Sequence, residues 1–179
     1  YLSRNHGNSL TGGFTGLPAD EFYRLAALLA RALQQVHARI VVHGDIWPEN
    51  IVMSSADGPV LTGLGQAIFR EAAHPHVKVS GRHRQYLAPE AGRSNGGDVY
   101  SLGGVLHYLA TGEDPPEPRQ DADALSTAVL DKLRANNPEL YLRARGVADV
   151  IAHALSPSNR RYTDVRTLLG HLETLMRTA

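Results

Sequence analysis

The stretch His43-Gly44-Asp45-Ile46-Trp47-Pro48-Glu49-Asn50 brings a histidine, two acids and an amide together within eight residues. A carboxylate such as that of Asp45 can take up a proton, and the amide oxygen of Asn50 is a suitable ligand for a hard cation such as Mg²⁺. Phosphate chemistry uses side chains of these kinds, but Trp47 stands in the middle of them. The segments around the loop therefore decide what it can do.

A long amphipathic helix is predicted before this loop, over residues 18–39. Its apolar side chains recur at steps of three and four residues and form one face, made of Phe22, Leu25, Leu29, Leu33 and Val36. Pro18 and the acids Asp20 and Glu21 suit the N-terminus of such a helix. Residues 1–17 are polar and rich in glycine, which predicts a connecting segment.

Short runs of β-branched residues at 40–42, 50–53 and 59–64 predict three small strands, the last two paired as a hairpin. Residues 65–97 carry few periodic apolar positions and predict a long loop. Helices are predicted over 98–112, 124–135, 146–155 and 163–178, with Thr163 as the N-cap of the last. The expected architecture is one domain over residues 1–179, mainly α, with a helical bundle and a small β-hairpin that carries the polar loop.

The bulk composition excludes several classes of protein. The net charge is zero, so electrostatics gives no reason to expect a nucleic-acid or anionic-membrane partner. The chain has no cysteine, which excludes disulfides and thiolate metal sites and suits a cytoplasmic location. No apolar run is long enough to span a membrane, and no signal segment opens the chain. Because the sequence begins with Tyr1, we expect it to be cut from a longer polypeptide.

The order of these pieces resembles the C-terminal lobe of a eukaryotic-type Ser/Thr protein kinase, over essentially all 179 residues. That family carries the signatures H-R-D-L-x-x-x-N, D-F-G and A-P-E in this order. Residues 43–50 match the first signature and Ala88-Pro89-Glu90 matches the third, and the helix "DVYSLGGVLHYLATG" follows. The high Ala, Arg and Gly content and the "RRY" element at 160–162 resemble bacterial members.

The resemblance implies a role for each matching residue. Asp45 would be the catalytic base that accepts the proton of the attacking hydroxyl, and Asn50 would bind the Mg²⁺ that accompanies ATP. His43 would pack in the core of the lobe rather than transfer protons. Asp98 would accept backbone N–H bonds from the catalytic loop, although an acid at a helix N-terminus needs no such role.

Glu90 would be a buried carboxylate at the end of the long loop and would need an arginine partner. The segment "SPSNRRYTD" offers Arg160 or Arg161. Spacing from Pro157 favours Arg160, whereas the Arg-Tyr pair of bacterial kinases favours Arg161. We predict Arg160 as the partner.

Three positions depart from the family pattern. Gly63-Leu64-Gly65 stands where D-F-G is expected, so the metal-binding Asp is replaced by Gly63. Trp47 replaces a lysine that approaches the transferred phosphate, and it could either pack over a helix end or block the pocket. Gly44 replaces an arginine that pairs with activation-loop phosphate.

Other expectations concern the surroundings of the loop. The family's Gly-rich loop, strand lysine and helix glutamate belong to an N-terminal lobe, which we expect before Tyr1 in the same polypeptide. His74, His76 and His83 lie in the predicted long loop, where solvated side chains are a better interpretation than a metal site. Ser80 is a conceivable phosphorylation site.

Three functions remain open from the sequence. The favoured one is a pseudokinase with lost or weak ATP-dependent phosphotransfer, acting as a signalling or scaffold module through a protein partner. Such a module can act without a cofactor. The second is a divergent, active Ser/Thr kinase that uses Asp45 as base with ATP and Mg²⁺ on a protein substrate. The third is a small-molecule kinase of the aminoglycoside or choline type, whose loops also resemble "HGD".

Overall fold

The structure is a computed structural model of the chain, and it describes residues 9–11, 15–39, 41–54, 58–69, 81–90, 93–117, 122–143 and 145–178. The described part is mainly helical, as predicted. Its α-helices are α1 (Ala19–Ala38), α2 (Asn95–Thr111), α3 (Ala122–Asn136), α4 (Pro138–Arg143), α5 (Arg145–Ala154) and α6 (Val165–Thr178). Its 3₁₀ turns are η1 (Pro48–Asn50), η2 (Leu64–Gln66) and η3 (Gly81–Tyr86).

The strands form two small antiparallel sheets. β2 (Ile51–Ser54) pairs with β3 (Gly58–Leu61), which confirms the predicted hairpin. β1 (Val41–Val42) pairs with β4 (Ile68–Phe69). β4 and η3 lie inside the stretch 65–97, so the prediction of a structureless loop there was wrong for these residues. Two-residue strands and 3₁₀ turns are too short to leave a periodic signal.

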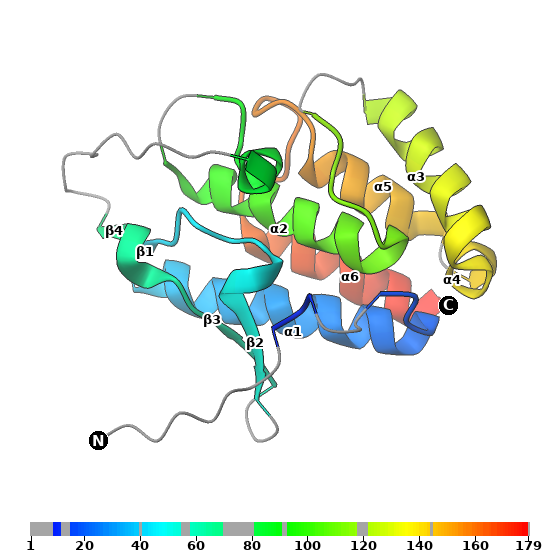
Figure 1. The fold of residues 1–179 in the computed structure, drawn as a ribbon, viewed down its shortest axis with the longest axis horizontal. Coiled ribbons are helices and arrows are strands. Elements are labelled where there is room, and N and C mark those ends of the chain that lie inside the picture. Colours follow the sequence, from blue (N-terminus) through cyan, green and yellow to red (C-terminus); the bar gives the residue numbers. More distant parts are fainter. Residues whose placement is uncertain are drawn as a thin grey trace.

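α2 is the central helix. Its buried residues point in every direction, because α1, α3, α5 and α6 all pack against it. In Figure 1, α2 crosses the middle of the molecule, with α1 along one side and α3 and α5 on the other. The loop 43–50 leaves β1 above α1 and meets the N-terminal end of α2. The core of the bundle thus fixes the frame on which the polar loop is held.

Two helix starts differ from prediction. α2 begins at Asn95 rather than at residue 98, because the side chain of Ser94 accepts the N–H of Gly97 at 3.0 Å and caps the helix. α6 begins at Val165, and its cap is Asp164 rather than Thr163. Asp164 Oδ1 accepts the N–H of Thr167 at 2.9 Å. The short helix α4 also had no predicted counterpart.

Candidate functional site

The loop 43–50 is anchored from below by one buried carboxylate. Asp98, which is 1% exposed, lies in the first turn of α2. Its Oδ2 accepts the backbone N–H of His43 at 2.8 Å, and its Oδ1 accepts that of Gly44 at 2.7 Å. His37 Nε2, from the end of α1, lies 2.9 Å from Asp98 Oδ2. The contact that the sequence predicts between Asp98 and the loop backbone is therefore present, and it joins α1, α2 and the loop.

His43 is fully buried under the loop. Its Nδ1 accepts the backbone N–H of Asp45 at 3.3 Å. Burial lowers the pKa of His43, while the nearby charges of Asp98 and Asp45 oppose that effect. The ring is thus a neutral core side chain that holds the backbone of Asp45, which agrees with the packing role expected for it.

Both carboxylate oxygens of Asp45 have neighbours. Asn50 Nδ2 donates to Asp45 Oδ2 at 2.7 Å and to the Asp45 carbonyl at 3.0 Å. His83 Nε2, from η3, lies 2.8 Å from Asp45 Oδ1. The two groups are close enough for an ion pair if His83 is protonated, but the angles are not those of a hydrogen bond. The Asp45 side chain is 15% exposed. The residue expected to meet a substrate hydroxyl therefore faces other side chains of this chain.

Gly63 and Asn50 share one space. Gly63 has φ of +78°, in the left-handed region that glycine adopts readily. A Cβ atom on residue 63 would lie 2.6 Å from Asn50 Cγ and 3.0 Å from Asn50 Oδ1. The amide of Asn50 thus fills the volume that a side chain at position 63 would need.

Trp47 stacks on His83. The two rings lie 4.7 Å apart between centroids, at an interplanar angle of 20°. Trp47 is partly buried against the core, and burial lowers the pKa of His83 although Asp45 and Glu49 oppose this. Neither of the two interpretations of Trp47 had included this partner. The sequence held no signal for the stack, because its two residues are 36 positions apart across the stretch 65–97.

The space above Gly44 is also occupied. A Cβ atom on residue 44 would lie 2.8 Å from Cδ and 3.1 Å from Nε of Arg93. An arginine thus covers this part of the loop, although it comes from the segment before α2 and not from position 44. Spacing within the loop could not have indicated it.

The partner of Glu90 is Arg161, so the prediction of Arg160 was wrong. Arg161 Nη1 and Nη2 donate to Glu90 Oε1 at 2.5 Å and Oε2 at 3.1 Å. The remaining N–H groups of Arg161 donate to the carbonyls of Ser156 and Gly96, so all five have acceptors. Burial raises the pKa of Glu90, but the bonds and charge of Arg161 outweigh it and hold the pKa below its usual value.

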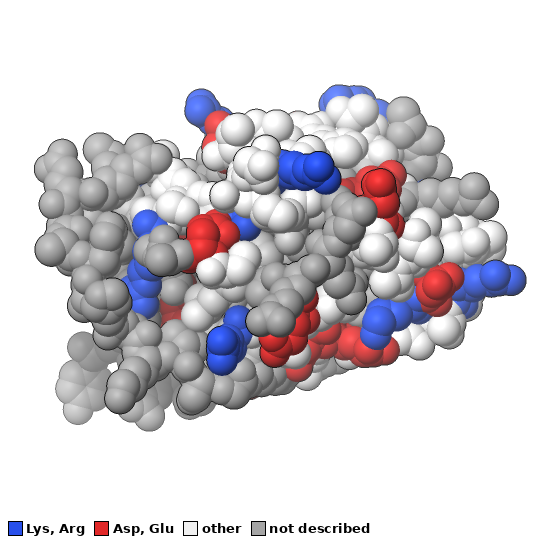
Figure 2. Space-filling model, turned by 90° about the horizontal axis from the view of Figure 1, so that it is seen from above, with Lys and Arg blue, Asp and Glu red and all other residues white. Residues whose placement is uncertain are grey.

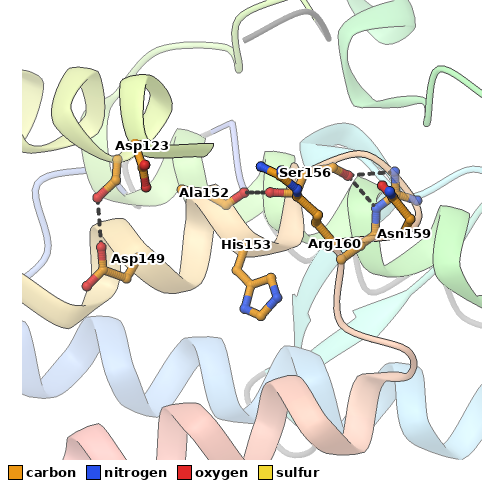
Figure 3. Close-up of a pocket in the computed structure, with 9 residues that line it drawn as sticks. Asp123, Asp149, Ala152, His153, Ser156, Asn159 and Arg160 are labelled. Carbon is orange, nitrogen blue, oxygen red and sulfur yellow. Dashed lines mark hydrogen bonds between the residues drawn. The ribbon is translucent and has the colours of Figure 1, made fainter. Parts of the chain in front are cut away.

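The turn that follows α5 explains why Arg161 is the partner. Backbone N–H groups of Arg160 and Arg161 both bond to the Pro157 carbonyl, and this tight turn sends the two side chains in different directions. Arg161 is buried, and its guanidinium lies 4.9 Å from the ring centroid of Tyr100. Arg160 is exposed and lines a cavity of about 620 Å³ between α3, α5 and this turn (Figure 3).

The metal chemistry of the loop is incomplete. Asn50 offers an amide oxygen, but the residue at the second expected position, Gly63, has no ligand atom in its side chain. Among the described residues no group of three His, Cys, Asp or Glu is placed to hold a metal ion. The described residues thus do not fit the two-ligand Mg²⁺ site of the family pattern. His74, His76 and Ser80 lie outside the described residues.

A family model of the protein kinase domain matches residues 7–171. The chain belongs to the protein kinase family. Among its relatives, the DNA damage-responsive serine/threonine-protein kinase RqkA of Deinococcus radiodurans is 29% identical, over 89% of this chain and 25% of the relative. The serine/threonine-protein kinase PknB of Mycobacterium leprae is 29% identical, over 69% of this chain and 24% of its own length.

A further relative is named as inactive. The inactive leucine-rich repeat receptor-like protein kinase CORYNE of Arabidopsis thaliana is 30% identical, over 53% of this chain and 24% of the relative. The chain spans about a quarter of the length of these curated relatives. The relatives of this chain thus include proteins named as kinases and one named as an inactive kinase.

On the face drawn in Figure 2, both acidic and basic side chains of the described residues are visible. Among the helices that the structure describes, none has the length and apolar character needed to cross a bilayer.

Proposed function

We propose that this chain is the C-terminal lobe of a pseudokinase, a kinase-family module with lost or weak phosphotransfer that acts by binding a protein partner. The observation that carries the proposal is the Asn50–Gly63 relationship. The position that would bring a metal-bound carboxylate is a glycine, and the amide of Asn50 occupies the space that a side chain there would need. Without that carboxylate, the protein lacks the main ligand for the Mg²⁺ that neutralises the charge of the transferring phosphates.

The neighbours of Asp45 support the same proposal. A base must reach the hydroxyl that it deprotonates, at roughly 2.6–3.2 Å. The two oxygens of Asp45 already face Asn50 and His83 at such distances. Losing a metal-bound charge costs several kcal/mol of transition-state stabilisation, and about 1.4 kcal/mol corresponds to one power of ten in rate.

A second candidate is a divergent active Ser/Thr kinase, and one observation favours it. The frame of the loop is complete, since Asp98 holds its backbone and the Glu90–Arg161 pair holds the segment that ends at Glu90. Under this alternative, Asp45 is the base and Asn50 holds one ion with the help of phosphate oxygens.

The deciding experiment uses the gene-length protein, in a thermal-shift titration with ATP in the presence and absence of Mg²⁺. A ligand at about 100 times its Kd stabilises a protein by about 2.7 kcal/mol, which such a titration detects. We expect no Mg²⁺-dependent shift for the wild type and a gain of one for Gly63→Asp. Gly65→Asp is the matched control, because it adds the same charge two residues away, where a Cβ meets no atom within 4 Å.

The result that would reverse the proposal is equally specific. If the wild type shows a Mg²⁺-dependent shift and transfers phosphate to a protein substrate, and if Asp45→Asn abolishes the transfer, the chain is a divergent kinase.

A further inference from the structure

A groove of about 380 Å³ runs between α1 and β3, away from the polar loop. Its helical wall is made of Leu28, Arg31, Ala32, Gln35, Val36 and Arg39, and its strand wall of Pro59, Val60 and Leu61. The helical positions follow the three- and four-residue spacing of one exposed stripe of α1. From residue 28 to residue 39 the stripe is about 16 Å long, which matches about five residues of extended chain.

The groove exposes large apolar side chains on both walls. Leu28 is 38% exposed and Val60 is 39% exposed, and they belong to the few large hydrophobic side chains exposed among the described residues. Val36 and Leu61 are half-buried beneath them and pack on the core. Single exposed apolar side chains need no explanation, but a leucine and a valine that line the same groove mark a place where apolar groups can be buried.

The charge of the groove has one sign. Arg31 and Arg39 line it, and no described residue of its lining is acidic. Arg24, also exposed, continues the same stripe of α1. Arg31 meets Glu173 of α6 at 2.7 Å, while Arg39 Nη1 donates to the Gln35 carbonyl of its own helix. A ligand that carries a carboxylate would find favourable charge at Arg39, whereas the charge of Arg31 is already paired with Glu173.

The strand wall offers backbone groups as well. At the outer edge of β2, the carbonyl of Ile51 accepts the N–H of Leu10, so this carbonyl points away from β3. Ile51 is paired in register with Leu61, and Thr62 N–H bonds to the Asn50 carbonyl. Because inward and outward pairs alternate in an antiparallel ladder, the N–H and C=O of Leu61 point away from β2. No described strand pairs with that edge of β3.

We propose that this groove is a docking site for an extended, acidic and apolar segment of a partner protein. Its apolar side chains would cover Leu28 and Val60, a carboxylate would meet Arg39, and its backbone would pair with Leu61. A second copy of the chain is a poorer occupant, because a two-fold contact sets the same arginines against each other. The proposal deepens the partner-binding function and rests on it, but binding here requires no nucleotide.

The test starts from the gene-length protein, immobilised without nucleotide, as bait for a random-peptide display library. We expect the selected peptides to combine apolar residues with Asp or Glu. Affinity is then measured by fluorescence polarisation for the labelled selected peptides. Leu28→Glu should weaken binding by about tenfold or more. Leu142→Glu, at a leucine of α4 that is 77% exposed and outside the groove, should leave it unchanged.

A charge reversal makes the test specific for the arginines. Arg39→Glu should weaken binding of the acidic peptides by about tenfold. When the acids of these peptides are changed to lysine, the Arg39→Glu variant should bind them better than it binds the acidic peptides. The proposal is overturned if no peptide is selected, if the selected peptides are basic, or if Leu28→Glu leaves binding intact. It is also overturned if sedimentation shows a wild-type dimer that Leu28→Glu dissociates, since the groove would then join two copies. A pseudokinase with a different docking face would fail this test and still pass the ATP titration, so the two failures are distinguishable.

Discussion

The amide of Asn50 lies where a side chain of Gly63 would begin, with Asn50 Cγ 2.6 Å from the position of a Cβ atom at residue 63. The missing side chain at position 63 and the orientation of Asn50 are thus one arrangement. With no side chain at position 63, the amide of Asn50 has room beside Asp45 and donates to it twice, to Oδ2 and to the backbone carbonyl.

A double-mutant cycle measures this arrangement. Gly63→Ala should lower the free energy of unfolding by about 2–4 kcal/mol, because alanine is strained by about 1–2 kcal/mol at φ of +78° and displaces Asn50 from two hydrogen bonds. In an Asn50→Ala background the same change should cost only the backbone part. Urea denaturation provides both values. Gly65→Ala is the control, with an expected change within about 0.5 kcal/mol. Equal costs in the two backgrounds would contradict the shared space.

The Trp47–His83 stack can be followed by fluorescence, because Trp47 is the only tryptophan of the chain. His83→Ala removes the ring that covers the indole at 4.7 Å, so the emission should change in intensity and its maximum should move to longer wavelength. His153→Ala is the matched control, since that ring contacts Tyr162 instead, at 4.2 Å between centroids. An unchanged spectrum in His83→Ala would mean that the two rings are not stacked in solution.

The two neighbouring arginines should differ sharply in their effect on stability. Arg161→Ala leaves Glu90 without its partner and should cost about 3–5 kcal/mol of unfolding free energy. Arg161→Lys keeps the charge but has three donors in place of five, and should recover only part of this loss. Arg160→Ala, at an exposed side chain, should cost less than about 1 kcal/mol. Denaturant titration of the three variants decides the matter, and a larger cost at position 160 would reverse the assignment.

Acid should destabilise the fold through His107. Burial lowers the pKa of His107 to about 4, and its Nδ1 lies 3.0 Å from the carbonyl of Glu113. The folded state therefore resists protonation. The contribution of His107 to the free energy of unfolding is fully present above its unfolded pKa of about 6.5. It is lost as the pH falls toward 4, by about 3 kcal/mol in all.

The measurement compares unfolding free energies at pH 7 and pH 4.5. His107→Gln should show a weaker dependence on pH than the wild type, because it removes one titrating group. His153→Gln, at an exposed histidine, should keep the wild-type dependence. The dependence does not vanish in His107→Gln, since burial lowers the pKa of His43 and His83 as well.

Sequence periodicity sufficed for the long elements. The apolar face of α1 was predictable because its buried residues recur at regular steps, and the hairpin β2–β3 because short runs of β-branched residues indicate its two strands. α2 was found as a helix, but its start was placed three residues late because the cap at Ser94 precedes two glycines. β4, η3 and α4 are too short for any periodicity to identify them.

The site divides in the same way. Asp98 and the loop were predictable from the family pattern, since their contact uses backbone groups that every such loop presents. The contacts of His83 with Asp45 and of Arg93 with Gly44 were not, because they join segments whose approach is decided by tertiary packing. The choice between Arg160 and Arg161 depended on the direction of one turn, which neighbouring identical residues cannot reveal.

The full set of acceptors around Arg161 has a consequence for how the molecule opens. One guanidinium bonds to Glu90, to Gly96 at the start of α2, and to Ser156 just after α5. It therefore connects three stretches of chain that are distant in sequence. None of them can detach without leaving buried N–H groups without acceptors. We expect amide protons around residues 86–90, 96–98 and 156–162 to exchange with solvent as a single cooperative unit, opened by one event rather than by independent fraying.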